Sequence, residues 1–558
     1  MKKLAVSRLG AALALLVAAP FVANAQTPTV IMPVQVDISP PLTELSMRAL
    51  ASTILWKERA LTGFLQPQVA PDPDVDTEAV LSAIPFVHTA AIPHVHVQTT
   101  DVARPRAAAT TGVNFDGIGV GLGTYSPCCA PPDTVGAPGL TQYVQVVNTD
   151  MAVFTKTGAL VVGPFPTSAL WAGFGGLCET TNQGDAIVLY DRLANRWLIS
   201  QFAFTVNVGG EPVAPFVQCI AVSTSSDATG SYARYGYGFT TELNDYPKIG
   251  VWPDAYYFSF NIFQAPTFSN TGIKPCAADR AKMLIADPTA VMLCFATGTY
   301  AGGNFGMLPT DLDGLTPPPL GTPNFFIRQR TTTPRSLGMN KFHVDFVTPA
   351  NSTFTAVPNI PVGSLERACG GGACIPQPGT AQVLDSLGDR LMHRLAYRNF
   401  GTREALVVTQ SVTPPAPSTA ASGVRWFELR DPNGASPVVF QNATYAPDNT
   451  SRWMASAAMD KLGNMLIGYS VSSSAVFPGI RYTGRLRGEP RNLMQAEAVI
   501  VNGGGSQINT FQRWGDYSSM NVDPADDCTF WYTTEYIKAT GSFNWSTRIA
   551  AIKFPNCQ

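Results

Sequence analysis

The chain has 558 residues, of which 45% are hydrophobic, 10% are aromatic and only 14% are charged, and its formal net charge is −2. This composition is sufficient for one large core and argues against nucleic acid or an anionic membrane as a partner. The 48 glycines and 45 prolines favour an all-β protein with many turns.

Residues 1–25 have the pattern of a secretory signal peptide. The basic residues Lys2, Lys3 and Arg8 precede an apolar run over 9–22, and an Ala-Asn-Ala cleavage site follows at 23–25. No later stretch has the roughly 20 apolar residues that a membrane-spanning helix requires. We therefore expect a secreted protein, periplasmic or extracellular, without a membrane span and monomeric.

Residues 26–112 lack the repeat found further along the chain. Apolar residues at helical spacing predict a helix over 42–62, and an Ala/Arg/Thr-rich linker covers 102–111. This segment is interpreted as an N-terminal extension, either a removable prosegment or a strap on the main domain.

Residues 113–558 repeat one phrase roughly every 60 residues, in which a turn precedes a buried strand and a second turn precedes an aromatic-rich strand. This period predicts a β-propeller built from four-stranded blades. Seven blades are favoured, and six or eight remain open. The expected starts are Asp133, Asp185, Asp245, a weak one at 341–346, Asp389, Arg452 and Asp516.

Ten cysteines in a secreted chain favour disulfides over metal thiolates. Proximity along the chain predicts four pairs, each within or beside one blade: Cys178–Cys219, Cys276–Cys294, Cys369–Cys374 and Cys528–Cys557. The adjacent Cys128 and Cys129 are left as either a vicinal disulfide or two thiols.

The repeated aspartates suggest a functional site, because equivalent strand starts meet at one end of a propeller channel. We expect Asp185, Asp245 and Asp516 as catalytic carboxylates, with Asp133 and Asp389 completing the ring. Converging carboxylates repel one another, which shifts their pKa values into the range used in acid/base chemistry. The alternative is that each aspartate caps its own turn.

Further side chains near these turns are candidates for substrate binding. Aromatic rings at a loop-built mouth stack on sugars, and guanidinium groups hold carboxylates. The candidates are His393, Arg452, Trp453, Arg513, Trp514 and Tyr517. The alternative is that the rings form the core, that the arginines pair with the aspartates and that the lone histidine is structural. No cofactor or metal site is expected, and calcium is left open at Asp311–Asp313 and Asp523–Asp527 because both resemble calcium loops only in part.

Several phrases resemble a group of secreted bacterial β-propellers of unassigned activity. They are Phe115-Asp116-Gly117, the Pro-Pro-Asp-Thr-Val-Gly run at 131–136, the Gln-Tyr-Val-Gln run from Gln142, and the Trp-Gly-Asp-Tyr-Ser-Ser-Met run at 514–520. The layout is more distantly similar to sialidase-type propellers. The Ser-x-Asp-x-Gly-x-Thr-Trp box of sialidases is missing, so the resemblance implies a fold and no catalytic residue.

Three functions follow from this pattern. The first is a glycan-directed propeller, a glycoside hydrolase or polysaccharide lyase acting on an extracellular polysaccharide at the channel mouth. The second is a non-catalytic surface module that binds glycan or protein. The third is a secreted protein whose N-terminal segment covers the site until it is removed.

Overall fold

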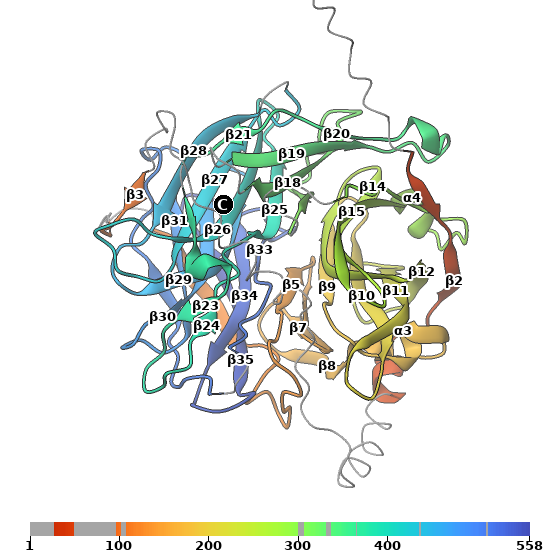
Figure 1. The fold of residues 1–558 in the computed structure, drawn as a ribbon, viewed down its shortest axis with the longest axis horizontal. Coiled ribbons are helices and arrows are strands. Elements are labelled where there is room, and N and C mark those ends of the chain that lie inside the picture. The colour runs from red at the N-terminus through yellow and green to blue at the C-terminus, as the bar shows by residue number, and fades with distance from the viewer. Residues whose placement is uncertain are drawn as a thin grey trace, which may run out of the picture.

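The structure, a computed structural model, describes residues 27–48, 96–101, 108–298, 306–330, 336–363, 365–434, 437–508 and 512–558. It is all-β, with 51% strand and 6% helix, which confirms the all-β part of the predicted fold class (Figure 1). The predicted signal peptide lies outside the described residues. Residues 42–48 are helical, as predicted, and the remainder of the expected helix, 49–62, also lies outside. No helix in the described ranges is long and apolar enough to cross a membrane.

Most strands belong to seven units of four strands, each unit antiparallel and hydrogen-bonded in the order given. The first three units are β5 (Val135–Pro138), β6 (Gln142–Val146), β7 (Asp150–Thr155) and β8 (Leu160–Pro166); β9 (Ile187–Asp191), β10 (Arg196–Val206), β11 (Pro212–Ser223) and β12 (Tyr232–Thr240); and β13 (Glu242–Val251), β14 (Ala255–Gln264), β15 (Ser269–Asp279) and β16 (Met292–Cys294). The next three are β17 (Leu308–Asp313), β18 (Asn324–Arg330), β19 (Ser336–His343) and β20 (Thr353–Ala356); β25 (Leu391–Asn399), β26 (Glu404–Thr413), β27 (Gly423–Arg430) and β28 (Val438–Tyr445); and β29 (Ser451–Met459), β30 (Met465–Ser472), β31 (Gly479–Arg485) and β32 (Ala498–Val501). The last unit combines β33 (Ser519–Val522), β34 (Thr529–Ile537) and β35 (Trp545–Lys553) with β4 (Thr110–Asp116).

The first strands of the units are neighbours in space. Each contacts the first strand of the next unit, and β33 contacts β5. Strands β17 and β25 go further and pair in parallel, which joins their units into one sheet. Strands β5, β9 and β33 lie near the middle of the view in Figure 1, whereas β2 (Pro33–Ile38) and β20 lie at its periphery.

The fourth unit begins at Leu308, which corrects the expected start at 341–346. Residues 341–343 belong to the third strand of that unit, β19, and the acidic run 311–313 lies in its first strand, β17. Because Asp311–Asp313 partly resembles a calcium loop, the sequence pattern does not predict a strand there. All six residues of β17 are buried.

Strands from the N-terminal segment extend the outer edges of three units. Strand β1 (Thr29–Ile31) pairs with β16, β2 pairs with β12, and β3 (Val97–Gln98) pairs in parallel with β28. An ion pair between Arg234 and Asp37, with Nε 2.7 Å from Oδ1, fixes β2. The described parts of the N-terminal segment, 27–48 and 96–101, therefore lie along the main domain, and the choice between prosegment and strap stays a prediction.

The remaining elements are short. The minor strands are β21 (Ile360–Pro361), β22 (Glu366–Arg367), β23 (Ala373–Ile375) and β24 (Leu384–Asp385). The helical turns are η2 (Thr167–Trp171), α3 (Gly176–Thr180), α4 (Arg280–Met283), η3 (Pro349–Asn351) and η4 (Ala368–Gly371).

Aspartates at the ends of first strands shape the turns that follow them. Asp191 Oδ1 accepts hydrogen bonds from the backbone N–H groups of Leu193 and Ala194, both at 3.1 Å. Asp460 does the same for Leu462 and Asn464, both at 2.9 Å. A carboxylate that satisfies two turn amides favours a tight hairpin over continued strand. This explains why a turn recurs at this point of the repeat.

All ten cysteines are paired. The five pairs at bonding distance are Cys128–Cys129, Cys178–Cys219, Cys276–Cys294, Cys369–Cys374 and Cys528–Cys557. They include the four predicted pairs, and Cys128 with Cys129 takes the vicinal form of the two alternatives. The Cys528–Cys557 pair ties the turn after β33 to the C-terminal residues.

Candidate functional site

Three of the predicted aspartates, Asp133, Asp185 and Asp516, lie together just before β5, β9 and β33. The backbone N–H of Asp516 donates to Asp133 Oδ1 at 2.7 Å. The Asn148 amide links Asp133 to Asp185, since its nitrogen donates to Asp133 Oδ2 and its oxygen accepts from the Asp185 N–H at 2.8 Å. The predicted convergence of these three aspartates is therefore present, and we call this group, with the residues that contact it, the carboxylate cluster.

The backbone at two of these aspartates is unusual. Asp133 and Asp185 have φ values of 45° and 47°, in the left-handed region that few side-chain-bearing residues adopt. Such conformations persist where surrounding contacts hold them and are common at functional sites. Here the Asn148 amide and the Asp516 N–H supply those contacts.

Burial and mutual repulsion shift the protonation of the cluster. Burial raises the pKa of Asp133 well above its ordinary value, and the charges of Asp516 and Asp185 raise it further. Burial, reinforced by Asp516 and opposed by Lys248, raises the pKa of Asp185 to about 7. Burial likewise raises the pKa of Glu535 to about 8, against a hydrogen bond from the Gly515 N–H. At neutral pH the Asp185 carboxyl is therefore divided between its protonated and ionised forms.

A buried lysine lies beside these carboxylates. Lys248 Nζ is 3.0 Å from the ring centroid of Tyr246 and 3.6 Å from that of Tyr517. The Tyr517 hydroxyl lies 3.2 Å from Asp185 Oδ2. Burial lowers the pKa of Lys248 well below its ordinary value, while Asp185, Asp516 and Asp133 oppose that shift.

The predicted residues Asp389 and His393 border the cluster. Asp389 forms an ion pair with Arg390 at 2.8 Å, and the Arg390 guanidinium lies 4.8 Å from the centroid of the Tyr246 ring. The His393 ring packs edge-on against Tyr517, with centroids 6.0 Å apart. Burial and nearby Lys248 lower the pKa of His393 well below its ordinary value, so its imidazole is neutral at pH 7.

Asp245 occupies β13 opposite Asn261. The ring contacts that join this segment to the cluster are made by Tyr246 and Lys248, one and three residues later. This offset arises because the pairing of β13 with β14 is irregular between Asp245 and Lys248.

The arginines and aromatic residues predicted to bind substrate have divided roles. Arg513 Nη2 is 2.8 Å from Asp516 Oδ1, so Arg513 belongs to the cluster. Arg452 instead pairs with Glu497 and Asp448 in a separate network. Trp453 and Trp514 pack against each other 5.4 Å apart. Both tryptophans are fully buried and Tyr517 is 1% exposed, so these rings present no open face for stacking on a sugar.

Sequence reasoning missed three members of the cluster, Lys248, Glu535 and Asn148. Lys248 lies in the Asp-Tyr-Pro-Lys-Ile-Gly run at 245–250, where the aspartate was the residue shared with the other repeats. Glu535 is an acidic residue in an otherwise aromatic and Thr-rich strand, Thr529–Ile537. A charge inside a buried strand is costly unless it has a role, and this was the available signal.

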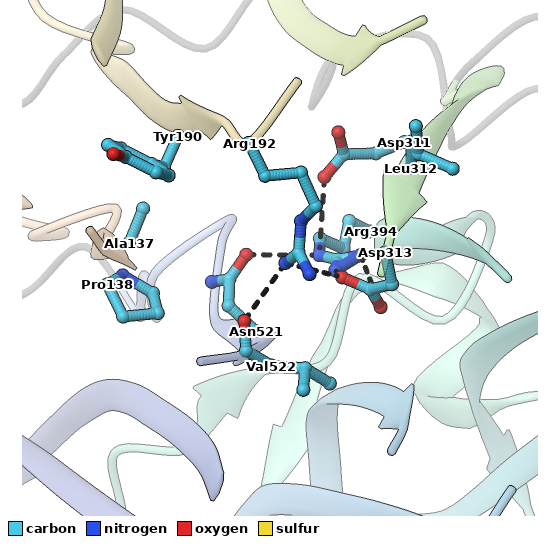
Figure 2. A pocket seen from close by; sticks show the side chains of 10 residues that line it. All are labelled: Ala137, Pro138, Tyr190, Arg192, Asp311, Leu312, Asp313, Arg394, Asn521 and Val522. Atoms are coloured by element: carbon cyan, nitrogen blue, oxygen red, sulfur yellow. Dashed lines mark hydrogen bonds and ion pairs between the residues drawn. The ribbon is translucent and has the colours of Figure 1, made fainter. Parts of the chain in front are cut away.

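A second charged group lies further along the first strands, around a cavity (Figure 2). The cavity has space of about 10 Å³ for the centre of a water molecule, which is enough for about one water. Arg394 and Arg192 pair there with Asp313, the latter through Nη2 and Oδ1 at 3.3 Å. Asp313 of β17 thus forms ion pairs with Arg394 and Arg192 further along the first strands. The carboxylate cluster, in contrast, lies at the starts of these strands.

The described ranges contain no group of three or more His, Cys, Asp or Glu side chains arranged to hold a metal ion. The two segments considered for calcium have protein partners: Asp313 pairs with Arg394, and Asp526 with Lys553 at 2.9 Å. Calcium binding thus remains a prediction.

The chain matches no protein-family model and no curated protein sequence. Among solved structures it is similar to the Hadza microbial sialidase Hz136, with 11% identity, coverage of 74% of this chain and 73% of the sialidase, and a TM-score of 0.35. The phage phi92 endosialidase is similar at 8% identity over 81% of this chain and 70% of its own, with a TM-score of 0.31. An endo-arabinase from Bacteroides thetaiotaomicron VPI-5482 is similar at 13% identity over 55% and 95%, with a TM-score of 0.28. These scores are too low to carry an argument, so the site is interpreted from its own residues.

Proposed function

We propose that the chain is a seven-bladed, glycan-directed β-propeller that hydrolyses glycosidic bonds at the carboxylate cluster. The seven four-stranded units and the contact of β33 with β5 support the seven-bladed arrangement. Strand β4 completes the last unit and thereby links the two ends of the domain.

One observation carries the catalytic proposal: Asp185 is partly exposed and has a pKa of about 7 beside a second carboxylate, Asp516. Glycoside hydrolysis uses two carboxyl groups in different protonation states, one as general acid and one as base or nucleophile. Asp185 holds the proton that the general acid requires near neutral pH. Arg513 pairs with Asp516, the second carboxyl group, at 2.8 Å.

In the proposed reaction Asp185 donates its proton to the oxygen of the leaving sugar as the glycosidic bond breaks. Asp516 removes a proton from the attacking water or adds to the anomeric carbon itself. In the second case water later releases the sugar and returns a proton to Asp185. Tyr517, whose hydroxyl lies beside Asp185, orients the acid.

The test is a polysaccharide panel incubated with the purified protein, scored for reducing ends and for retention of the protein on each polymer. Asp185→Asn and Asp516→Asn are expected to reduce cleavage by about 10²- to 10⁴-fold, the usual contribution of a general acid or base. Asp460→Asn is the matched control, because Asp460 caps a turn after β29. Full cleavage by folded Asp185→Asn would contradict the proposal.

A non-catalytic module that binds glycan elsewhere on its surface is the second candidate, favoured by the burial of the carboxylate cluster. Asp133, Lys248 and Asp516 are 3%, 1% and 9% exposed, which leaves a small open surface for chemistry. Retention on a polymer without release of reducing ends would support this candidate and exclude hydrolysis of that polymer.

A further inference from the structure

A column of alternating cations and tyrosine rings leads into the carboxylate cluster. The Arg390 guanidinium lies over Tyr246, Lys248 Nζ lies between Tyr246 and Tyr517, and the Tyr517 hydroxyl reaches Asp185. The two tyrosine rings are 5.4 Å apart and inclined at 36°, so the ammonium is held between them. Each cation in the column therefore meets the electron-rich face of a ring.

The ammonium has little conventional hydrogen bonding. Its one hydrogen bond within the described residues is to Pro247 O at 3.4 Å, and the residue is 1% exposed. A buried lysine with so few acceptors is costly, and replacing it with an apolar side chain of similar length would remove that cost. Lys248 lies against the Tyr517 ring, whose hydroxyl contacts Asp185, so its charge is held close to the carboxylates.

The charged and titratable groups that act on Asp185 and Lys248 come from several first strands and from the loops before them. They are Asp133, Asp185, Tyr246, Lys248, Arg390, His393, Arg513, Asp516 and Tyr517. Lys248 is the cation with the largest effect on Asp185, ahead of Arg513. In turn, Asp185 is the carboxylate with the largest effect on Lys248.

We propose that Lys248 is a positioning residue of the carboxylate cluster: its side chain, clamped between the rings of Tyr246 and Tyr517, holds the counter-charge for Asp185 in place. This inference rests on the proposed function for its catalytic meaning. The effect of Lys248 on the titration of Asp185 can be measured without any substrate.

The experiment compares Asp185→Asn with its parent in two backgrounds, the wild-type chain and Lys248→Met, by thermal melting between pH 4 and 10. The difference in melting temperature produced by Asp185→Asn changes with pH between the pKa of Asp185 in the unfolded chain and its pKa in the folded state. Its slope against pH falls to half at the folded-state pKa, and we call that pH the midpoint. In the wild-type background the midpoint is expected near pH 7, in accord with the pKa of about 7. In the Lys248→Met background it is expected at least one pH unit higher, because the carboxylate has lost its main counter-charge.

Lys274→Met is the matched control, since Lys274 lies in the same sheet and pairs with Glu242. It is expected to leave the midpoint near pH 7. An unchanged midpoint in folded Lys248→Met would overturn the proposal and make Lys248 a packing residue. If Lys248→Met does not fold, Tyr246→Leu decides the question: removal of one ring is expected to raise the midpoint by a smaller amount, and no shift would overturn the proposal.

The outcome is separable from that of the proposed function. A shifted midpoint in a protein that cleaves and binds no glycan would support the role of Lys248 and reject glycan hydrolysis. Cleavage by a protein whose midpoint is unshifted in Lys248→Met would support glycan hydrolysis and reject the role of Lys248. Where cleavage is found, Lys248→Met is also expected to move the pH profile of kcat/KM upward, which a loss of packing alone would not do.

Discussion

The two ends of the first strands use the same residue type for different purposes. At the starts, Asp133, Asp185 and Asp516 contact one another's segments across separate units. At the ends, Asp460 bonds to amides within its own turn, and Asp191 does so as well while it also accepts hydrogen bonds from Tyr256 and Arg280 of the next unit. Burial raises the pKa of both Asp460 and Asp133, but hydrogen bonds from its own turn oppose the rise at Asp460, whereas neighbouring carboxylates add to the rise at Asp133. The comparison teaches that the partner of an aspartate, and not its place in a repeat, decides its role.

The largest expected effect at the cluster end is a pH dependence of stability. The pKa of Asp185 is about 7 in the folded protein and close to 3.8 in the unfolded chain, so the folded state holds the proton between about pH 4 and 7. The free energy of unfolding therefore falls as pH rises through that window, by up to about 4 kcal/mol from this group. Asp185→Asn removes this loss, so its stability relative to wild type should rise with pH and level off above pH 7. Urea unfolding at several pH values measures the difference, and a pH-independent difference would sink the comparison.

A smaller effect is expected from the disulfide at the turn end. Cys528 follows the turn after β33 and is bonded to Cys557, 29 residues later. Replacing both cysteines with alanine should cost about 3 kcal/mol, because a closed loop of this size restricts the unfolded chain. The cluster lies at the other end of the first strands, so cleavage by the folded variant should remain. Chemical denaturation and non-reducing peptide mapping check the two statements, and free thiols in the wild-type protein would refute the pairing.

The smallest of these effects is expected from a single turn cap. Asp460→Ala removes the acceptor for the Leu462 and Asn464 amides in a residue that is fully buried. We expect a loss of about 2 kcal/mol, the usual cost of leaving buried polar groups unpaired. Urea unfolding of the variant and the wild type at pH 8 measures the loss. A variant as stable as the wild type would contradict the capping role of Asp460.

The sequence predicted the all-β class and most unit starts because each strand is apolar or aromatic between turn residues. It failed at β17, where Asp311 and Asp313 make a buried first strand look like a loop. Those charges are tolerated because Arg394 and Arg192 reach them from other units, a contact that no local pattern contains.

The candidate site divides in the same way. Repetition identified Asp133, Asp185 and Asp516, since equivalent positions in neighbouring units converge. Repetition gave no information about Lys248 or Glu535, each of which occurs once. Repetition also did not distinguish buried from exposed rings. Trp453 and Trp514 lie beside turn residues in the sequence, as the rings of a loop-built binding site would, yet both are buried and pack against each other.

Strand β4 has a consequence for the order in which the molecule is assembled. Its residue Asn114 bonds to Arg548, 434 positions later, so β4 is among the first parts of this domain to be synthesised and waits for nearly the last. Pairing across such a separation is slow, because loop closure must precede the contacts that reward it. Until β35 has been synthesised, β4 lacks its pairing partner. A ribosome-bound chain halted before residue 545 would therefore remain protease-sensitive at β4, and completion of the last turns of sequence would act as the closing event of folding.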